Sequence, residues 1–87
     1  MLRTRNLTLS STPTLLTITD GVDGPCTISI QNTDNSKSLF IGEENVSSSS
    51  YGIKLTNGLI TSIDLSPYDK LYAVGDGTTV AVLILER

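Results

Sequence analysis

The chain has 87 residues, of which nine are acidic, six are basic and none is histidine, for a formal net charge of −3. A chain of this length holds a single hydrophobic core, so we expect one domain over residues 1–87. The acidic balance leaves no basic patch, which excludes nucleic acid as an expected partner. No segment approaches the roughly 20 consecutive apolar residues that span a membrane as a helix, so no membrane contact is expected.

Short stretches of β-forming residues recur along the chain, separated by glycine, asparagine, aspartate and proline. This punctuation is typical of strands joined by turns, and the scarcity of alanine, lysine and glutamate disfavours helices. The clearest stretch is 26–30, where Cys26, Ile28 and Ile30 alternate with polar residues and are expected to face the core. The expected strands cover residues 7–9, 15–19, 26–30, 37–41, 51–55, 59–65, 70–74 and 79–85.

Three turns, at residues 32–36, 57–58 and 75–77, are expected to close hairpins between consecutive strands. The pair at 57–58 is Asn-Gly, the strongest short hairpin signal, because both residues tolerate positive φ. The polar stretch 42–50 is interpreted as an exposed loop.

About eight short strands without a helix predict an all-β fold: a small β-sandwich or jelly-roll-like domain with antiparallel strands. Its core must consist of leucine, isoleucine and valine, because the chain has no tryptophan and only four other aromatic residues. Residues 1–12 could belong to this domain or form an extended N-terminal arm that reaches a neighbour.

The last strand is the most informative, because it is apolar at every position from 80 to 85. A strand with one face on a core and the other in water alternates apolar and polar residues. Both faces of this strand are apolar, so a partner chain is expected to cover the second one, with a lid from the same chain as the alternative. The residues expected to supply core and subunit contacts are Val80, Val82, Leu83, Ile84 and Leu85.

Candidates for chemistry are few. Cys26 is the only cysteine, so no intrachain disulfide can form, and no histidine is present to activate its thiol. Asp20 and Asp23 lie in a Gly-rich turn that lacks the full ligand series of a calcium loop, so the turn explains them better than a metal does. We therefore expect no enzymatic activity, cofactor or metal, and no small-molecule substrate. Tyr51 and Tyr68 keep a carbohydrate-binding module open as an alternative.

From Ser38 onward the chain resembles small β-rich structural proteins of tailed bacteriophages, including capsid decoration, or cement, proteins. The pattern is an apolar strand ending in glycine, a polar loop, Gly-apolar-x-Leu, an alternating strand, a Leu-Tyr-Ala strand and a terminal strand. It is carried by Leu39-Phe40-Ile41-Gly42, Gly52-Ile53-Lys54-Leu55, Ile63-Asp64-Leu65, Asp69-Lys70-Leu71-Tyr72-Ala73 and Val80-Ala81-Val82.

The resemblance implies a virion protein without enzymatic activity, assembled in the host cytoplasm. Decoration proteins of this kind commonly form homotrimers on the major capsid protein and stabilise the assembled head by binding it. Leu2, Arg3 and Arg5 are then candidates for an arm that contacts the capsid. A phage tail, fibre or head–tail accessory protein is the alternative within the same class.

Overall fold

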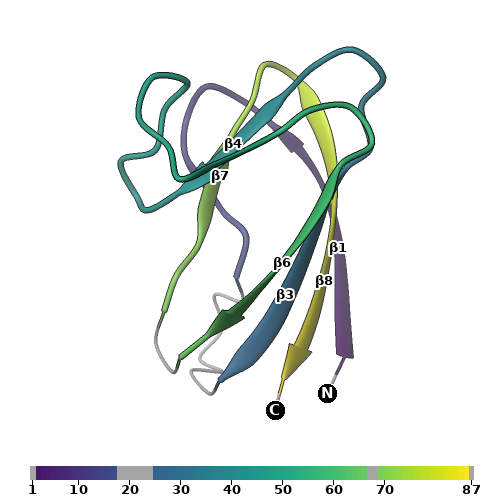
Figure 1. Cartoon of the computed structure of the whole chain (residues 1–87), viewed down its shortest axis with the longest axis vertical. Coiled ribbons are helices and arrows are strands. Elements are labelled where there is room, and N and C mark those ends of the chain that lie inside the picture. Colours follow the sequence, from purple (N-terminus) through teal and green to yellow (C-terminus); the bar gives the residue numbers. More distant parts are fainter. Residues whose placement is uncertain (1, 18–24, 67–68, 87) are drawn as a thin grey trace.

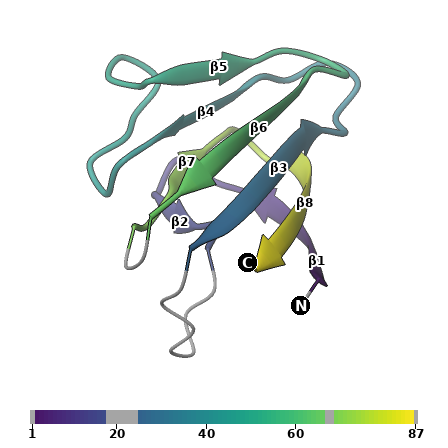
Figure 2. The same cartoon turned by 60° about the horizontal axis from the view of Figure 1, so that its bottom comes forward.

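Two four-stranded antiparallel sheets pack face to face in the computed structural model, which describes residues 2–17, 25–66 and 69–86. Figures 1 and 2 show the sheets as two layers. No helix occurs within these residues. The strands are β1 (Leu2–Leu9), β2 (Thr14–Leu15), β3 (Cys26–Asn32), β4 (Leu39–Gly42), β5 (Ile53–Leu55), β6 (Ile60–Leu65), β7 (Tyr72–Val74) and β8 (Thr78–Glu86).

The strand order identifies a jelly roll. Sheet A has the order β1-β8-β3-β6, and sheet B has the order β2-β7-β4-β5. Among the described strands, β4 and β5 are the one consecutive pair that shares a sheet. Every other connection crosses from one sheet to the other, the interleaving of an eight-stranded jelly roll. The predicted all-β sandwich of about eight short antiparallel strands is thus confirmed.

The core lies between the sheets and is aliphatic, since successive side chains of a strand alternate between its two faces. Sheet A contributes alternate residues of β3 and β8, with Ile28, Ile30 and Ile84 at 1% exposure or less. The inward positions expected for residues 26, 28 and 30 are confirmed, although Cys26 at the end of β3 is only partly buried. The buried cluster is Leu9, Leu16, Ile28, Ile30, Leu39, Ile41, Leu55, Leu65, Ala73, Val80, Val82 and Ile84.

The three expected hairpins are wrong, although chain reversals do occur at all three places. Each reversal joins a strand of one sheet to a strand of the other: β3 to β4, β5 to β6, and β7 to β8. The Asn-Gly turn forms with Gly58 at φ 76° and with the Leu59 N–H donating to the Thr56 carbonyl at 3.1 Å. The same turn chemistry serves a hairpin and a sheet-to-sheet corner, because both need positive φ at a tight reversal.

The N-terminal segment is a strand of the sandwich and not an arm. Leu2 to Leu9 pair with β8 in an unbroken register from Leu2 opposite Leu85 to Leu9 opposite Thr78. The Arg5 guanidinium Nη1 also donates to the carbonyls of Leu15, Leu16 and Thr17 at 3.0, 3.0 and 3.1 Å. Arg5 therefore links β1 to the end of β2 and to the two residues that follow it. The expectation of an extended arm over residues 1–12 is corrected accordingly.

A buried asparagine joins two connections at one end of the sandwich, the one from β3 to β4 and the one from β5 to β6. Asn32 ends β3 with no exposed surface, and its Nδ2 donates to the carbonyls of Lys37 and Leu55 at 2.8 and 2.9 Å. Its Oδ1 accepts from the Asp34 N–H at 2.8 Å, and its backbone bonds to Gly58 and Leu59. All its polar groups are thus paired, as burial requires.

Candidate functional site

An apolar stripe runs along the outer face of sheet A, on the side that faces away from the core. Leu83 and Leu85 of β8 are exposed by 42% and 47% of their surface. Leu2 lies directly opposite Leu85 on β1 and is 59% exposed. We call Leu2, Leu83 and Leu85 the leucine stripe.

The five residues expected to supply core and subunit contacts fall into two groups in the structure. Val80, Val82 and Ile84 are each 1% exposed and lie inside the chain's own core. The core contacts expected of these three residues are thus confirmed, whereas a partner cannot reach them for the expected subunit contact. Leu83 and Leu85 are open to solvent within the described part of the chain, so the second face of the strand has no lid from these residues.

The rest of this face is lined with hydroxyl groups. Cross-strand pairs join Thr27 to Asp64 at 2.8 Å and Ser29 to Ser62 at 2.8 Å, between β3 and β6. Of the described side chains on this face, Asp64 is the only ionisable one, and its Oδ1 accepts a hydrogen bond from the Thr27 hydroxyl. A sheet face that is apolar along one side and nearly uncharged is a candidate for contact with another protein.

A shallow depression of about 180 Å³ lies beside the stripe. Its lining includes Leu83, Ala81 and, across β3, Ile60, which is 63% exposed. The small Ala81 leaves room between the two larger side chains. Hot-spot residues of protein interfaces commonly fill depressions of this kind on the partner.

The free edge of sheet A continues the same surface. β1 is one of the two edge strands of the sheet, the other being β6, and in the described residues β8 is the one strand that pairs with β1. Eight residues without a proline or a break in register leave one row of backbone groups available for pairing. The outward side chains of β1, from Leu2 to Thr8, carry no charge that would discourage association.

Leu2, Arg3 and Arg5 do not form one group, since alternate residues of β1 face opposite sides. Leu2 belongs to the leucine stripe, while Arg3 and Arg5 share the inner side of the strand and are half-buried. Sequence reasoning did not place Leu2 beside Leu85, nor did it include Ile60. The positions of Leu2 and Ile60 depend on the register between strands that are not consecutive in the chain. The hydrophobic pattern of the sequence alone does not predict that register.

Three of the residues considered for chemistry, Asp20, Asp23 and Tyr68, lie outside the described residues. The acidic pair Glu43 and Glu44 is exposed on the loop after β4. No group of three or more His, Cys, Asp or Glu side chains gathers within residues 2–17, 25–66 and 69–86. These residues also contain no helix long and apolar enough to cross a membrane.

One carboxyl group is perturbed by its surroundings. The pKa of Asp34 is lowered, chiefly because the Ser36 N–H donates to its carboxylate at 2.9 Å, with a further bond from the Lys37 N–H at 3.0 Å. Asp34 is partly exposed and these bonds close the turn between β3 and β4, so its role is structural.

No known family model matches the chain, and no curated protein matches it. A solved structure described under "Bacillus endospore appendages form a novel family of disulfide-linked pili" is similar in fold, with a TM-score of 0.57 and 10% sequence identity. The match covers 99% of this chain and 85% of that one. At this identity the likeness shows a shared β-rich fold.

Proposed function

We propose that the protein is a non-enzymatic structural subunit that assembles with other copies of itself through the outer face of sheet A. The observation that carries the proposal is the leucine stripe, three exposed leucines in adjacent positions on β1 and β8. Covering one such side chain stabilises an assembly by roughly 1 kcal/mol, since each is already about half-buried.

A second copy of the chain is the best-matched occupant of this face. The face carries one carboxylate and no described cation, so two copies meet without the repulsion of many like charges. The depression beside Ala81 is of a size to receive a leucine side chain from the facing copy. Hydroxyl groups around the stripe supply a polar rim, as in other protein interfaces.

The size of the face indicates that one contact alone is weak. Four strands and seven residues of β8 span roughly 450 Å² at ordinary sheet spacings, against about 800 Å² per partner in a standard stable interface. Assembly therefore gains most from repeated contacts, in a closed ring or on a lattice.

The structural neighbour supports the proposal only in that its fold is found in a pilus. The pili of that neighbour are disulfide-linked, and this chain need not share that linkage. Cys26 is the only cysteine, so each copy can take part in one disulfide at most. A polymer of this chain has to propagate through non-covalent contacts, for which the leucine stripe is the candidate.

Our finer proposal is that the assembly belongs to a tailed-phage virion, as a homotrimeric capsid decoration protein bound to the major capsid protein. Its support is the sequence resemblance from Ser38 onward. Because the leucine stripe lies at one edge of sheet A, it can meet a different surface of a neighbour around a three-fold axis. Immunogold labelling of virions tests the location: label over heads supports decoration, label on tails favours the tail or fibre alternative, and unlabelled virions contradict both.

Paired substitutions test the self-assembly proposal. Leu83→Ser with Leu85→Ser should shift the chain toward monomer in sedimentation velocity, with thermal unfolding little changed because both side chains face solvent. Leu59→Ser is a matched control: Leu59 is 49% exposed but lies at the corner before β6, away from the stripe. Equal sedimentation of the double variant and the unmodified chain would refute an interface at the stripe.

A further inference from the structure

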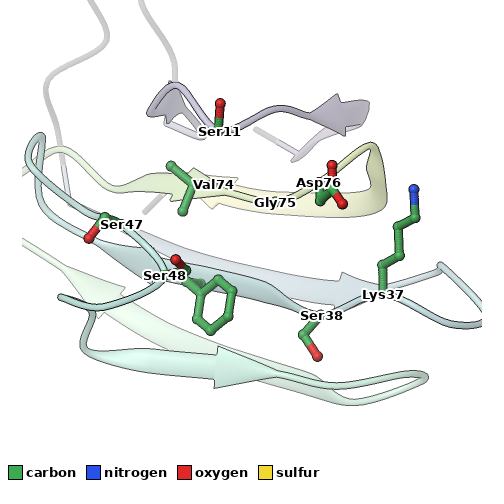
Figure 3. A pocket seen from close by; sticks show the side chains of 9 residues that line it. Ser11, Lys37, Ser38, Ser47, Ser48, Val74, Gly75 and Asp76 are labelled. Atoms are coloured by element: carbon green, nitrogen blue, oxygen red, sulfur yellow. The ribbon is translucent and has the colours of Figure 1, made fainter.

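The outer face of sheet B holds a hollow of about 570 Å³, within the range of small-ligand sites. It lies on the sheet opposite the leucine stripe, over β4 and β7. Connections rise around it: Ser11 before β2, Ser47 and Ser48 after β4, and Gly75 and Asp76 after β7 (Figure 3). Lys37 and Ser38 border it at the start of β4.

The apolar part of the lining is a supported aromatic ring. Phe40 occupies the outward position of β4, between Val74 of β7 and Lys54 of β5. The Tyr51 ring packs against it with centroids 4.9 Å apart and planes tilted by 48°, and the Lys54 ammonium lies 5.7 Å from its centroid. Contacts from two residues hold the ring in place, so it can receive a ligand without first being ordered.

Several polar groups around the ring are available for a ligand. Within the described part of the chain, the hydroxyls of Ser11, Ser38 and Ser48 make no hydrogen bond, and neither does the Asp76 carboxylate. The Ser47 hydroxyl differs, because it accepts from the Ser50 N–H at 3.1 Å and organises its own loop. The hollow thus offers free donors and acceptors next to an aromatic surface.

We propose that this hollow binds a neutral saccharide. A sugar ring has an apolar C–H face that packs on an aromatic ring, and hydroxyl groups at its rim that pair with serine, lysine and carboxylate groups. The charges of the two ionisable lining residues, Lys37 and Asp76, offset each other, which favours a neutral ligand over a phosphate or sulfate. Lys54 adds a positive charge beside the Phe40 ring but is not part of the lining. Phe40 is the packing surface, and Tyr51 is its support.

This site is independent of the proposed self-assembly, because it lies on the other sheet of the sandwich. It also differs from the expected glycan contacts of Tyr51 and Tyr68. The sequence predicts Phe40 within a strand, and its outward position over a hollow depends on the pairing of β4 with β7.

The test is a nitrogen–proton NMR titration of the full chain with glucose, galactose, mannose, N-acetylglucosamine, maltose and lactose, each to about 20 mM, a range that detects millimolar affinity. We expect saturable shifts with at least one probe, confined to the amides of residues 37–40, 47–48 and 74–76. No shift with any probe, or shifts confined to sheet A, would overturn the proposal.

Variants then separate binding from folding. Phe40→Leu keeps an apolar side chain and should weaken binding by between about twofold and about tenfold, since it removes the aromatic face. Ser38→Ala with Ser48→Ala tests the rim without disturbing the ring and should also weaken binding. Ser62→Ala, on the outer face of sheet A, should bind as the unmodified chain does. Unchanged affinity in both test variants would refute the site.

Discussion

The buried side chain of Asn32 stabilises the end of the sandwich through hydrogen bonds to Lys37, Leu55 and Asp34. Replacing it with alanine leaves the carbonyls of Lys37 and Leu55 and the Asp34 N–H without their partner at a buried site. We expect Asn32→Ala to lower the free energy of unfolding by at least about 2 kcal/mol, measured by urea denaturation. The exposed Asn6→Ala is the control and should change stability by less than about 0.5 kcal/mol. Equal effects of the two changes would show that the network contributes little.

Gly75 and Gly58 lack a side chain for different physical reasons, which alanine substitutions can test. A Cβ at Gly75 would lie 2.6 Å from the Thr78 hydroxyl oxygen and 2.8 Å from its Cβ, whereas at Gly58 nothing lies within 4 Å. Gly75→Ala should destabilise the chain by about 1–3 kcal/mol through steric overlap. Gly58→Ala meets only the strain of its φ of 76° and should cost about 1 kcal/mol. A larger loss at Gly58 than at Gly75 in thermal unfolding would contradict this ranking.

Asp34 gives the chain a specific acid sensitivity. Its pKa in the folded state lies below the ordinary value of 3.8, because the Ser36 N–H bonds its charged form. The ionised carboxylate therefore contributes stability above the unfolded-state pKa, and this contribution is lost as the pH falls through the folded-state pKa. Asp34→Asn should show a smaller loss of stability than the unmodified chain between about pH 4 and pH 2. Parallel pH profiles of the two unfolding midpoints would contradict the assignment.

Strand β1 is expected to be essential to the fold. Deleting residues 1–6 removes the pairing of Leu2 to Asn6 with β8, together with the three bonds that Arg5 donates. We expect the truncated chain to lose at least about 10 °C in melting temperature by circular dichroism, since a few kcal/mol shift a domain of this size that far. Thr4→Ser, on the outward side of β1, should melt as the unmodified chain does. An unchanged melting temperature after truncation would mean that the segment acts as an arm.

Strand positions followed from the sequence because alternation is a local property. The inward residues of β3 were predicted correctly, and an eight-stranded sandwich was the right class. Connectivity was not predictable in this way, because Asn57-Gly58 suits a hairpin and a corner equally well. β1 was foreseen only over residues 7–9, since Arg3 and Arg5 interrupt its inner side. Their inward placement depends on partners elsewhere in the chain, such as the carbonyls that accept from Arg5.

Half of the candidate interface could be predicted on the same basis. Leu83 and Leu85 alternate with Val82 and Ile84, so two opposite apolar faces are evident from the sequence pattern alone. Leu2 joins the stripe because β1 pairs with β8, and its contribution required the register between the two ends of the chain. The hollow around Phe40 was not foreseen, because four connections and two strands meet there.

On the scale of the whole molecule, the two outer faces of the sandwich differ in character. Sheet A presents a leucine stripe on a nearly uncharged surface, and sheet B presents a hollow with balanced charges. First and last strands lie side by side in sheet A (Figure 1), so both ends of the chain adjoin the proposed interface. In the proposed assembly, subunits join through sheet A while the hollow on sheet B stays accessible.

The solution mass of the unmodified chain, measured by multi-angle light scattering over a range of concentrations, tests the central claim of self-assembly most directly. A single chain has a mass of 9.3 kDa. We predict an average mass that exceeds this value and rises with concentration, with a plateau at three chain masses if the ring is a trimer and at two if the stripe pairs with itself. A mass of one chain at every concentration up to about 1 mM, where even weak contacts form, would contradict assembly through sheet A.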